Sequence, residues 1–399
     1  MNRSAIRITA LIGLLVFLDL ALWSAITPLL SYWSRTIGMT KPQAGIISGV
    51  YSGAIVLASI PAGHMADRLG AKKVTLAATA LFALAAPLTG FADAVWEVLV
   101  LRLLQGIFSA VSWSAGIAWL AAVVGSSSRA RAIGLVNAVV PLGMVAGPAL
   151  GGPLVGGLGP GVAMTGFGVV VAVLFLALAT QPDAVSEHHE QLTLRETLST
   201  SLRDSWLLVA NCALFVIAFG QTLVQTLAPL HLKAGAISQS EIGYVFMGVA
   251  SMSLVATVAT TQLGARMARW RSMIVAVGVC CGGLVCVLLA APLGIPAYIT
   301  VLVLYAAPQS VAFTAAYALA SDGAARSGVG QGIAMAALST TWGIGAFLSP
   351  TALAPLADAT DDRLAFGVVA ALMVVSALGL VALSRRGTGP TVARARGVG

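Results

Sequence analysis

The stretch GHMADRLGAKK, residues 63–73, places four charged side chains between two long apolar runs. The runs lie near residues 42–66 and 74–93, and each is close to the roughly twenty residues that a helix needs to cross the hydrocarbon core of a bilayer. Gly63 and Gly70 permit close helix contact and a sharp turn. The stretch is therefore predicted to be a short loop between two membrane helices.

Similar apolar runs fill the rest of the 399-residue chain, which is 58% hydrophobic and 9% charged. Soluble domains carry roughly 25% charged residues, so this chain needs lipid as part of its solvent. Long runs without period-two alternation predict helices rather than a barrel. The chain is thus predicted to be an all-α membrane protein. Its twelve transmembrane helices are expected near residues 8–33, 42–66, 74–93, 95–124, 131–157, 161–180, 205–232, 239–265, 272–291, 296–322, 327–356 and 362–384.

The basic residues fall mainly on one side of these helices. If the N-terminus is cytoplasmic, seventeen Lys and Arg residues lie on the cytoplasmic side and four on the outer side, with Arg102 inside a helix. This bias predicts a multi-pass protein of the cell inner (plasma) membrane with both termini in the cytoplasm. The net charge of +8 is explained by this orientation, so no nucleic-acid partner is expected.

Landmark residues recur about 201 positions apart, which indicates a duplicated six-helix unit. A site between such halves is expected near the bilayer midplane. The paired landmarks are Pro28 with Pro229, Gly63 with Gly264, and Pro148 with Pro350. The predicted organisation is an N-terminal bundle (1–180), a cytoplasmic linker (181–204), a C-terminal bundle (205–384) and a basic cytoplasmic tail (385–399). Within the linker, residues 193–202 are either plain connection or a short amphipathic helix on the membrane surface.

The charged stretch at residues 63–73 resembles the signature loop of the major facilitator superfamily of transporters. In that family the loop latches the two halves together on the cytoplasmic side. The resemblance implies this role for Asp67, with Arg129 or Arg131 as its partner. The residues that carry it are Gly63, Asp67, Arg68, Gly70, Lys72 and Lys73. The two-bundle major facilitator fold is what the resemblance implies for the whole chain.

Two further motifs extend the resemblance. RLLQG, residues 102–106, is similar to the family's fourth-helix motif, whose arginine is linked to proton transfer; alternatively, Arg102 snorkels toward the membrane surface. GMVAGPALGG, residues 143–152, resembles the motif of drug and metabolite antiporters, which implies export. Its glycines permit close helix approach and its proline can kink the helix. The residues of this motif are Gly143, Gly147, Pro148, Gly151 and Gly152.

Asp19 lies near the centre of the first predicted helix, in FLDLALWSAITPLL (residues 17–30). A carboxylate at this depth is costly and needs a proton or a cationic partner. Asp19 is therefore a candidate for proton coupling and substrate binding, and a structural ion pair with Arg102 is the alternative. The other candidate substrate contacts are Trp23, Asn137, Gln221, Gln225, Tyr305, Gln309, Phe313 and Trp342.

These patterns predict a secondary active transporter that exports hydrophobic or cationic small molecules in exchange for protons, by alternating access. The alternatives are an uptake permease or uniporter for a neutral solute, a membrane sensor without transport, and a membrane enzyme. No catalytic motif or phosphate-binding loop supports an enzyme or ATP drive. The cysteines show no metal-ligand spacing, so no metal is expected. The expected transporter fold implies no cofactor. The expected partners are the substrate, protons and membrane lipid, and the chain is expected to be a monomer.

Overall fold

The computed structural model describes residues 3–124, 126–183, 204–263, 266, 270–329 and 331–386. Within these residues, twelve helices are long and apolar enough to cross a membrane, as predicted. Several predicted helix ends are wrong, and the first membrane helix begins at Arg3 rather than near residue 8. The tenth membrane helix does not end near residue 322 but continues to Ser327, and the helix that was expected to start at 327 begins at Gln331. The reason is Gly328, whose left-handed backbone (φ 71°) ends the tenth helix.

The N-terminal half contains six membrane-crossing segments, two of which are interrupted by π-helical turns. Its elements are α1 (Arg3–Thr36), α2 (Lys41–Leu69), α3 (Ala71–Phe91), α4 (Val95–Val111), η1 (Ser112–Gly116), α5 (Ile117–Val124), α6 (Ser126–Ala138), α7 (Val140–Ala149), η2 (Leu150–Leu154), α8 (Val155–Leu158) and α9 (Pro160–Ala179).

The C-terminal half contains the other six. Its elements are α11 (Ser205–Ala234), α12 (Gln239–Leu263), α13 (Arg271–Leu289), α14 (Ile295–Ser327), α15 (Gln331–Ala359) and α16 (Asp362–Arg386). Most of the predicted linker, including residues 193–202, lies outside the described residues, as does the tail from residue 387 onward.

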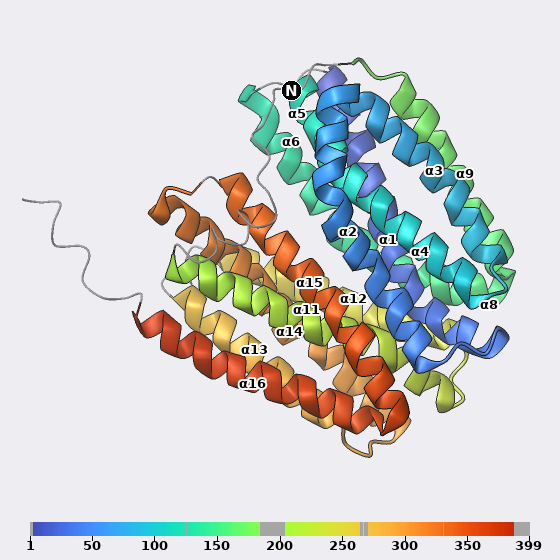
Figure 1. Ribbon diagram of the computed structural model, residues 1–399, viewed down its shortest axis with the longest axis vertical. Coiled ribbons are helices and arrows are strands. Elements are labelled where there is room, and N and C mark those ends of the chain that lie inside the picture. Colours follow the sequence, from blue (N-terminus) through green and yellow to red (C-terminus); the bar gives the residue numbers. More distant parts are fainter. Residues whose placement is uncertain are drawn as a thin grey trace, which may run out of the picture.

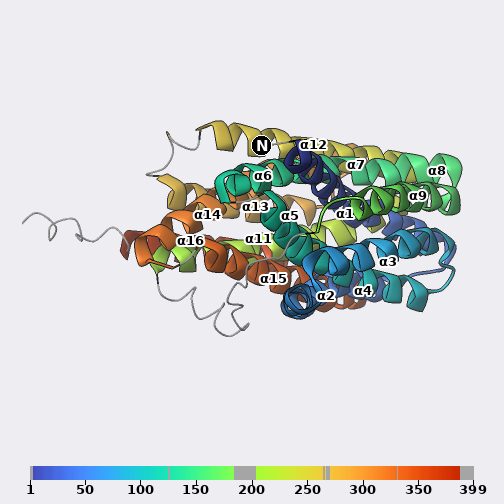
Figure 2. The ribbon, with the colours of Figure 1, turned by 90° about the horizontal axis from the view of Figure 1, so that it is seen from above.

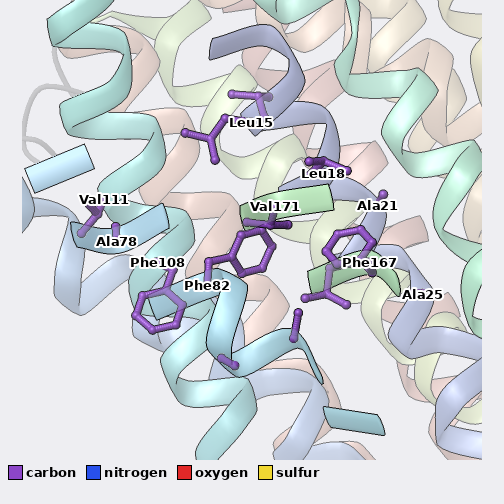
Figure 3. Packing of buried hydrophobic residues seen from close by; sticks show 14 of the residues in the cluster. Leu15, Leu18, Ala21, Ala25, Ala78, Phe82, Phe108, Val111, Phe167 and Val171 are labelled. Carbon is purple, nitrogen blue, oxygen red and sulfur yellow. The ribbon is translucent and has the colours of Figure 1, made fainter. Parts of the chain in front are cut away.

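The two halves form two groups of helices with separate hydrophobic cores (Figure 1). In the N-terminal core, Phe82 of α3 meets Phe167 of α9 edge to face, with ring centroids 6.0 Å apart (Figure 3). Such aromatic pairs stabilise a fold by more than the burial of their apolar area alone. Lipid adds little hydrophobic drive between helices, so close packing of this kind holds each bundle together.

Glycines allow the halves to contact each other closely on two sides (Figure 2). On one side α15 packs on α2, where a Cβ added to Gly45 would lie 2.2 Å from the carbonyl oxygen of Pro350. On the other side α12 packs on α7, and a Cβ added to Gly243 would lie 2.8 Å from the carbonyl oxygen of Pro148. The two landmark prolines thus occupy equivalent places, as an internal repeat requires.

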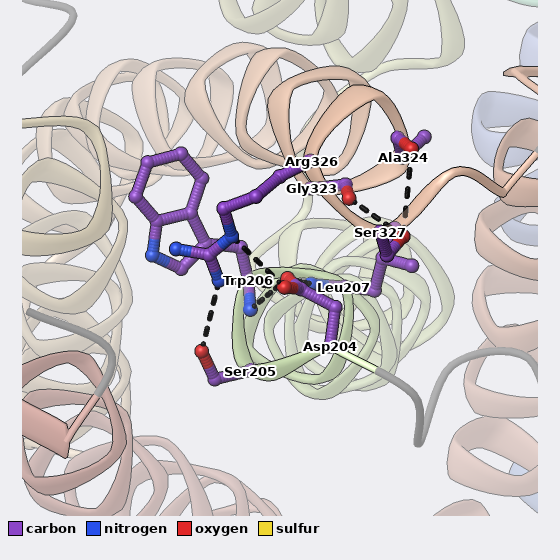
Figure 4. Close-up of polar contacts among 8 residues, drawn as sticks. All are labelled: Asp204, Ser205, Trp206, Leu207, Gly323, Ala324, Arg326 and Ser327. Atoms are coloured by element: carbon purple, nitrogen blue, oxygen red, sulfur yellow. Dashed lines mark hydrogen bonds and ion pairs between the residues drawn. The ribbon is translucent and has the colours of Figure 1, made fainter. Parts of the chain in front are cut away.

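Asp204 fixes the start of the C-terminal half (Figure 4). Its Oδ1 accepts hydrogen bonds from the backbone N–H groups of Trp206 at 2.7 Å and Leu207 at 3.3 Å, which caps α11. Its Oδ2 pairs with the guanidinium of Arg326 at 2.6 Å, and this guanidinium lies 4.0 Å above the Trp206 ring. These contacts join the first turn of α11 to the last turn of α14.

Candidate functional site

Asp19 lies inside the N-terminal bundle, near the middle of α1, and is 4% exposed. The hydroxyl of Ser109, on α4, donates a hydrogen bond to its Oδ2 at 2.6 Å. The hydroxyl of Tyr51, on α2, donates to Ser109 at 2.9 Å. Three helices therefore supply a chain of hydroxyl groups that ends on the carboxyl group of Asp19.

Arg102 faces the interior and is 2% exposed, so the alternative in which it snorkels outward is wrong. Its Nη1 donates to the side-chain oxygen of Gln105 at 3.0 Å, and its guanidinium carbon lies 4.5 Å from the centre of the Tyr51 ring. Among the described residues, Arg102 and Asp19 form no ion pair within 4.0 Å. Tyr51 connects the two, because its ring faces Arg102 and its hydroxyl reaches Ser109.

The fourth membrane helix, which carries Arg102 and Ser109, departs from regular α-helix close to this network. The π-helical turn η1 begins three residues after Ser109, and a second one, η2, begins two residues after Pro148. π-Helical turns inside α-helices are rare and are found frequently at functional sites. Both lie in helices that contact α1, the helix of Asp19.

A small cavity of about 20 Å³ lies between the two halves. Three of the predicted site residues, Trp23, Arg102 and Gln225, meet there. Trp23 also contacts Trp342 of α15 across the halves, with ring centroids 6.1 Å apart. Arg102 is the charged residue in a lining that is otherwise neutral. The lining residues are Trp23, Ile26, Thr27, Leu30, Ser48, Ser52, Arg102, Thr222, Gln225 and Thr226.

Other predicted substrate contacts do not line this cavity. Tyr305 and Gln309 lie in the core of the C-terminal bundle, where the Tyr305 hydroxyl and both Gln309 amide atoms have no hydrogen-bond partner among the described residues. Phe313 packs on Tyr317 within α14, with ring centroids 4.8 Å apart. Asn137 is exposed on α6, and Gln221 is half-buried on α11. Their part in binding stays a prediction.

The loop motif lies at the end of the molecule that contains the N-terminus. The prediction that residues 63–73 form a loop is wrong in extent, because α2 continues to Leu69 and α3 begins at Ala71. Only Gly70 lies between the two helices, and its φ of 93° provides the predicted sharp turn. Lys72 donates to the carbonyl oxygen of Gln181 at 2.5 Å and so holds the end of the sixth membrane helix. The latch between Asp67 and a basic partner stays a prediction. The remaining residues are Gly63 (half-buried), Arg68 and Lys73 (exposed), Arg129 (half-buried) and Arg131 (exposed).

The glycines of the 143–152 motif bring the fifth membrane helix against two neighbours. A Cβ added to Gly143, Gly147 or Gly151 would lie 2.6, 2.2 or 2.0 Å from a backbone carbonyl oxygen of α1. A Cβ added to Gly152 would lie 2.3 Å from Gly243 of α12, in the other half. The predicted close approach is therefore present, and it links α1 to the contact between the halves.

Ser109 was not predicted as a site residue, although one sequence signal was available. It lies seven residues after Arg102, so both are on the same face of a helix. Hydroxyl residues are frequent in membrane helices, and only the position of Asp19 on the neighbouring helix distinguishes this one.

Comparison with curated proteins gives relatives with several activities. The chain is 32% identical over 184 residues to an uncharacterized MFS-type transporter, C18.02, of Schizosaccharomyces pombe, covering 45% of this chain and 40% of that protein. It is 28% identical over 255 residues to Multidrug resistance protein MdtG of Proteus mirabilis (60% and 61%). It is 32% identical over 125 residues to a probable 4-methylmuconolactone transporter of Cupriavidus pinatubonensis (31% and 28%). The chain thus spans about two fifths of the length of the first of these relatives and less than two thirds of the others.

Solved structures share the fold over nearly the whole chain. A bacterial homolog of the human lysosomal transporter Spinster, in an inward-facing and occupied conformation, matches with a TM-score of 0.78 and 14% identity, over 96% of this chain and 98% of that one. The nucleoside transporter NupG matches with a TM-score of 0.76 and 15% identity, over 96% and 100%. A family model described as Major Facilitator Superfamily matches residues 12–337.

Proposed function

This chain belongs to the Major Facilitator Superfamily and is a membrane transporter rather than an enzyme, and we propose that it exports hydrophobic or cationic small molecules in exchange for protons. The observation that carries this proposal is the buried carboxyl group of Asp19 in the middle of a membrane helix. The 143–152 motif and the relative named for multidrug resistance support export. We place the protein in the plasma membrane as a monomer, with both termini in the cytoplasm.

The surroundings of Asp19 favour proton exchange over a fixed ion pair. A carboxylate that is removed from water and lacks a cation within ion-pair distance is costly to keep charged. Binding a proton removes that charge. The hydroxyl groups of Tyr51 and Ser109 lead to Asp19 at 2.9 and 2.6 Å and offer a path for the proton.

The contacts between the halves support alternating access. Hydrogen bonds that join the halves within the described residues lie at the end opposite the N-terminus, for example from Lys41 to Asp362 at 2.7 Å and from Lys233 to Ser34 at 3.1 Å. We call this end of the molecule the far end. The ribbons of the two halves lie farther apart near the N-terminus (Figure 1). With cytoplasmic termini, this arrangement corresponds to a state closed toward the outside, and rocking of the halves opens the far end.

Exchange then follows from competition. Asp19 and Trp23 are four residues apart on α1 and share a helix face, and Trp23 lines the cavity between the halves. A cationic substrate that reaches Asp19 displaces its proton, and a proton displaces the substrate. Because the two cannot occupy the site together, they cross the membrane in opposite directions. Protons that enter down their gradient therefore drive the substrate outward.

The cavity lining favours a second candidate, an uptake permease or uniporter for a neutral solute. Six of the ten lining residues carry a hydroxyl or amide group, and the charged one, Arg102, would repel a cation. NupG, a structure of the same fold, is a nucleoside transporter.

Purified protein in proteoliposomes distinguishes the two candidates. We expect an imposed pH gradient to drive accumulation of ethidium, a hydrophobic cation, together with proton movement in the opposite direction. Uridine serves as the neutral solute. Uridine flux without proton movement, and without any ethidium flux, would refute proton-coupled export and favour the second candidate.

A further inference from the structure

Gln239, the first residue of α12, forms four hydrogen bonds to the opposite half of the molecule. It is 8% exposed. Its amide nitrogen donates to the carbonyl oxygens of Pro28 at 2.9 Å and Gly151 at 2.7 Å. Its amide oxygen accepts from the Ser31 hydroxyl at 3.0 Å and from Nη2 of Arg35 at 2.8 Å. All four partners belong to the N-terminal half, so this single side chain connects the two halves.

The groups around the Gln239 side chain match both the nitrogen and the oxygen of a primary amide. A glutamine amide carries two N–H donors and one oxygen with two acceptor positions. Here two carbonyl acceptors face its nitrogen, and two donors face its oxygen. A carboxylate of the same shape has no donor for the carbonyls. An apolar side chain removes all four bonds and leaves the Ser31 hydroxyl only its bond to the Pro28 carbonyl oxygen at 2.6 Å. Buried polar groups without partners are costly.

The backbone geometry around Gln239 fixes its position. Gly151 lies in the π-helical turn η2, and Pro28 lies inside α1. Gly243, one turn after Gln239 on α12, packs so closely on Gly152 that a Cβ on either would lie within 2.6 Å of the other residue's Cα. The amide therefore enters the seam between α1 and η2 as a consequence of helix packing.

Other contacts at the far end are more open to water. In the ion pair of Lys41 with Asp362, the side chains are 33% and 19% exposed. Exposed ion pairs contribute little because water screens them. Within the described residues, Gln239 forms buried hydrogen bonds across the halves at this end, to Pro28, Gly151 and Ser31, whereas its bond from Arg35 is partly buried.

We infer that Gln239 is the positioning residue that keeps the far end closed, and that each opening toward the far side must break its four hydrogen bonds at once. This role goes beyond the proposed function, because it depends on neither the direction of transport nor proton coupling. The side-chain amide of Gln239 thereby sets the balance between the closed and open states of the far end.

Hydrogen–deuterium exchange, measured by mass spectrometry on the full chain in lipid nanodiscs, tests this role. The readout is protection of the backbone amides in residues 37–44 and 235–242, which comprise the two far-end loops and the first turns of α2 and α12. Gln239→Met is expected to lower protection there about tenfold or more, since it removes several buried hydrogen bonds. The matched control is Gln262→Met, the same change at an exposed position on the same helix, and it should leave protection unchanged.

Gln239→Glu separates hydrogen bonding from packing, because the two side chains have the same shape. At about pH 8, where a carboxyl group is normally ionised, its oxygens would face the carbonyl oxygens of Pro28 and Gly151. We expect protection at the far end to fall below wild type, because neither carbonyl then has its donor. The fall should be smaller than in Gln239→Met, because the carboxylate still accepts from Ser31 and Arg35. Wild-type protection in the Glu variant would show that the bonds to the Pro28 and Gly151 carbonyls do not keep the far end closed, and would overturn the inference. So would wild-type protection in a folded Gln239→Met variant.

Discussion

Replacing Gly151 with alanine adds one methyl group where the fifth membrane helix meets α1. In the structure, the new Cβ would lie 2.0 Å from the carbonyl oxygen of Ala25 and 2.9 Å from Cγ of Pro28. Ordinary contact begins at 3.4 Å, so the helices must separate by about 1.4 Å. A backbone carbonyl cannot rotate away as a flexible side chain can.

The expected destabilisation has two parts. Forcing an extra carbon into a well-packed contact typically costs about 1–3 kcal/mol. The same movement displaces the Gly151 carbonyl oxygen from Gln239, now 2.7 Å away, and losing that hydrogen bond costs roughly 1 kcal/mol more. We therefore expect the free energy of unfolding to fall by at least about 2 kcal/mol.

Gly157 provides the matched control in the same membrane helix. No atom lies within 4 Å of a Cβ added there, and the residue is exposed. Gly157→Ala should leave stability unchanged or raise it by up to about 1 kcal/mol, since alanine favours the helix. Unfolding of both variants by sodium dodecyl sulfate in mixed micelles gives the comparison. Equal unfolding free energies for Gly151→Ala and Gly157→Ala would refute the close packing described here.

Three further changes test other parts of the structure. Ser109→Ala removes the hydroxyl that bonds to Asp19, and should lower proton-driven flux in proteoliposomes about tenfold; Ser109→Thr should restore it, and unchanged flux in the alanine variant would exclude the hydroxyl path. Asp204→Ala removes the cap of α11 and the partner of Arg326, and should lower the free energy of unfolding by at least about 1 kcal/mol. Asp204→Asn keeps a capping oxygen and should recover the part of that loss that is due to the cap. Lys41→Met breaks a partly exposed ion pair and should change that free energy by less than about 1 kcal/mol; a larger loss would contradict the screening argument.

The sequence alone predicts the membrane helices, and it singles out Asp19 and Arg102, because a charge in an apolar run is conspicuous at any helix rotation. It does not reveal how the two are connected. Tyr51 and Ser109 join them because α2 and α4 turn those hydroxyl groups toward α1, and that rotation depends on contacts between distant segments. The same limit explains why Gln225 lines the cavity whereas Gln309 faces the core of its own bundle.

Gln239 illustrates a second limit. A glutamine at the start of a membrane helix is unremarkable in sequence, since helix ends lie near water. Its importance comes from two carbonyl groups on other helices. Glycine motifs predict helix contacts more reliably than a single glutamine does. A residue without a side chain, repeated at helical spacing, has few purposes other than close approach of a neighbouring helix. Gly143, Gly147 and Gly151 all serve that purpose.

In the proposed mechanism, Asp19 carries the proton whose movement drives transport. The most direct test compares wild type with Asp19→Asn in proteoliposomes loaded with ethidium, measuring exchange without a gradient and transport driven by a pH gradient. We expect the variant to fold as wild type does, judged by its thermal unfolding, and to lose transport driven by the pH gradient. Undiminished pH-driven ethidium transport by Asp19→Asn would show that Asp19 does not carry the coupling proton.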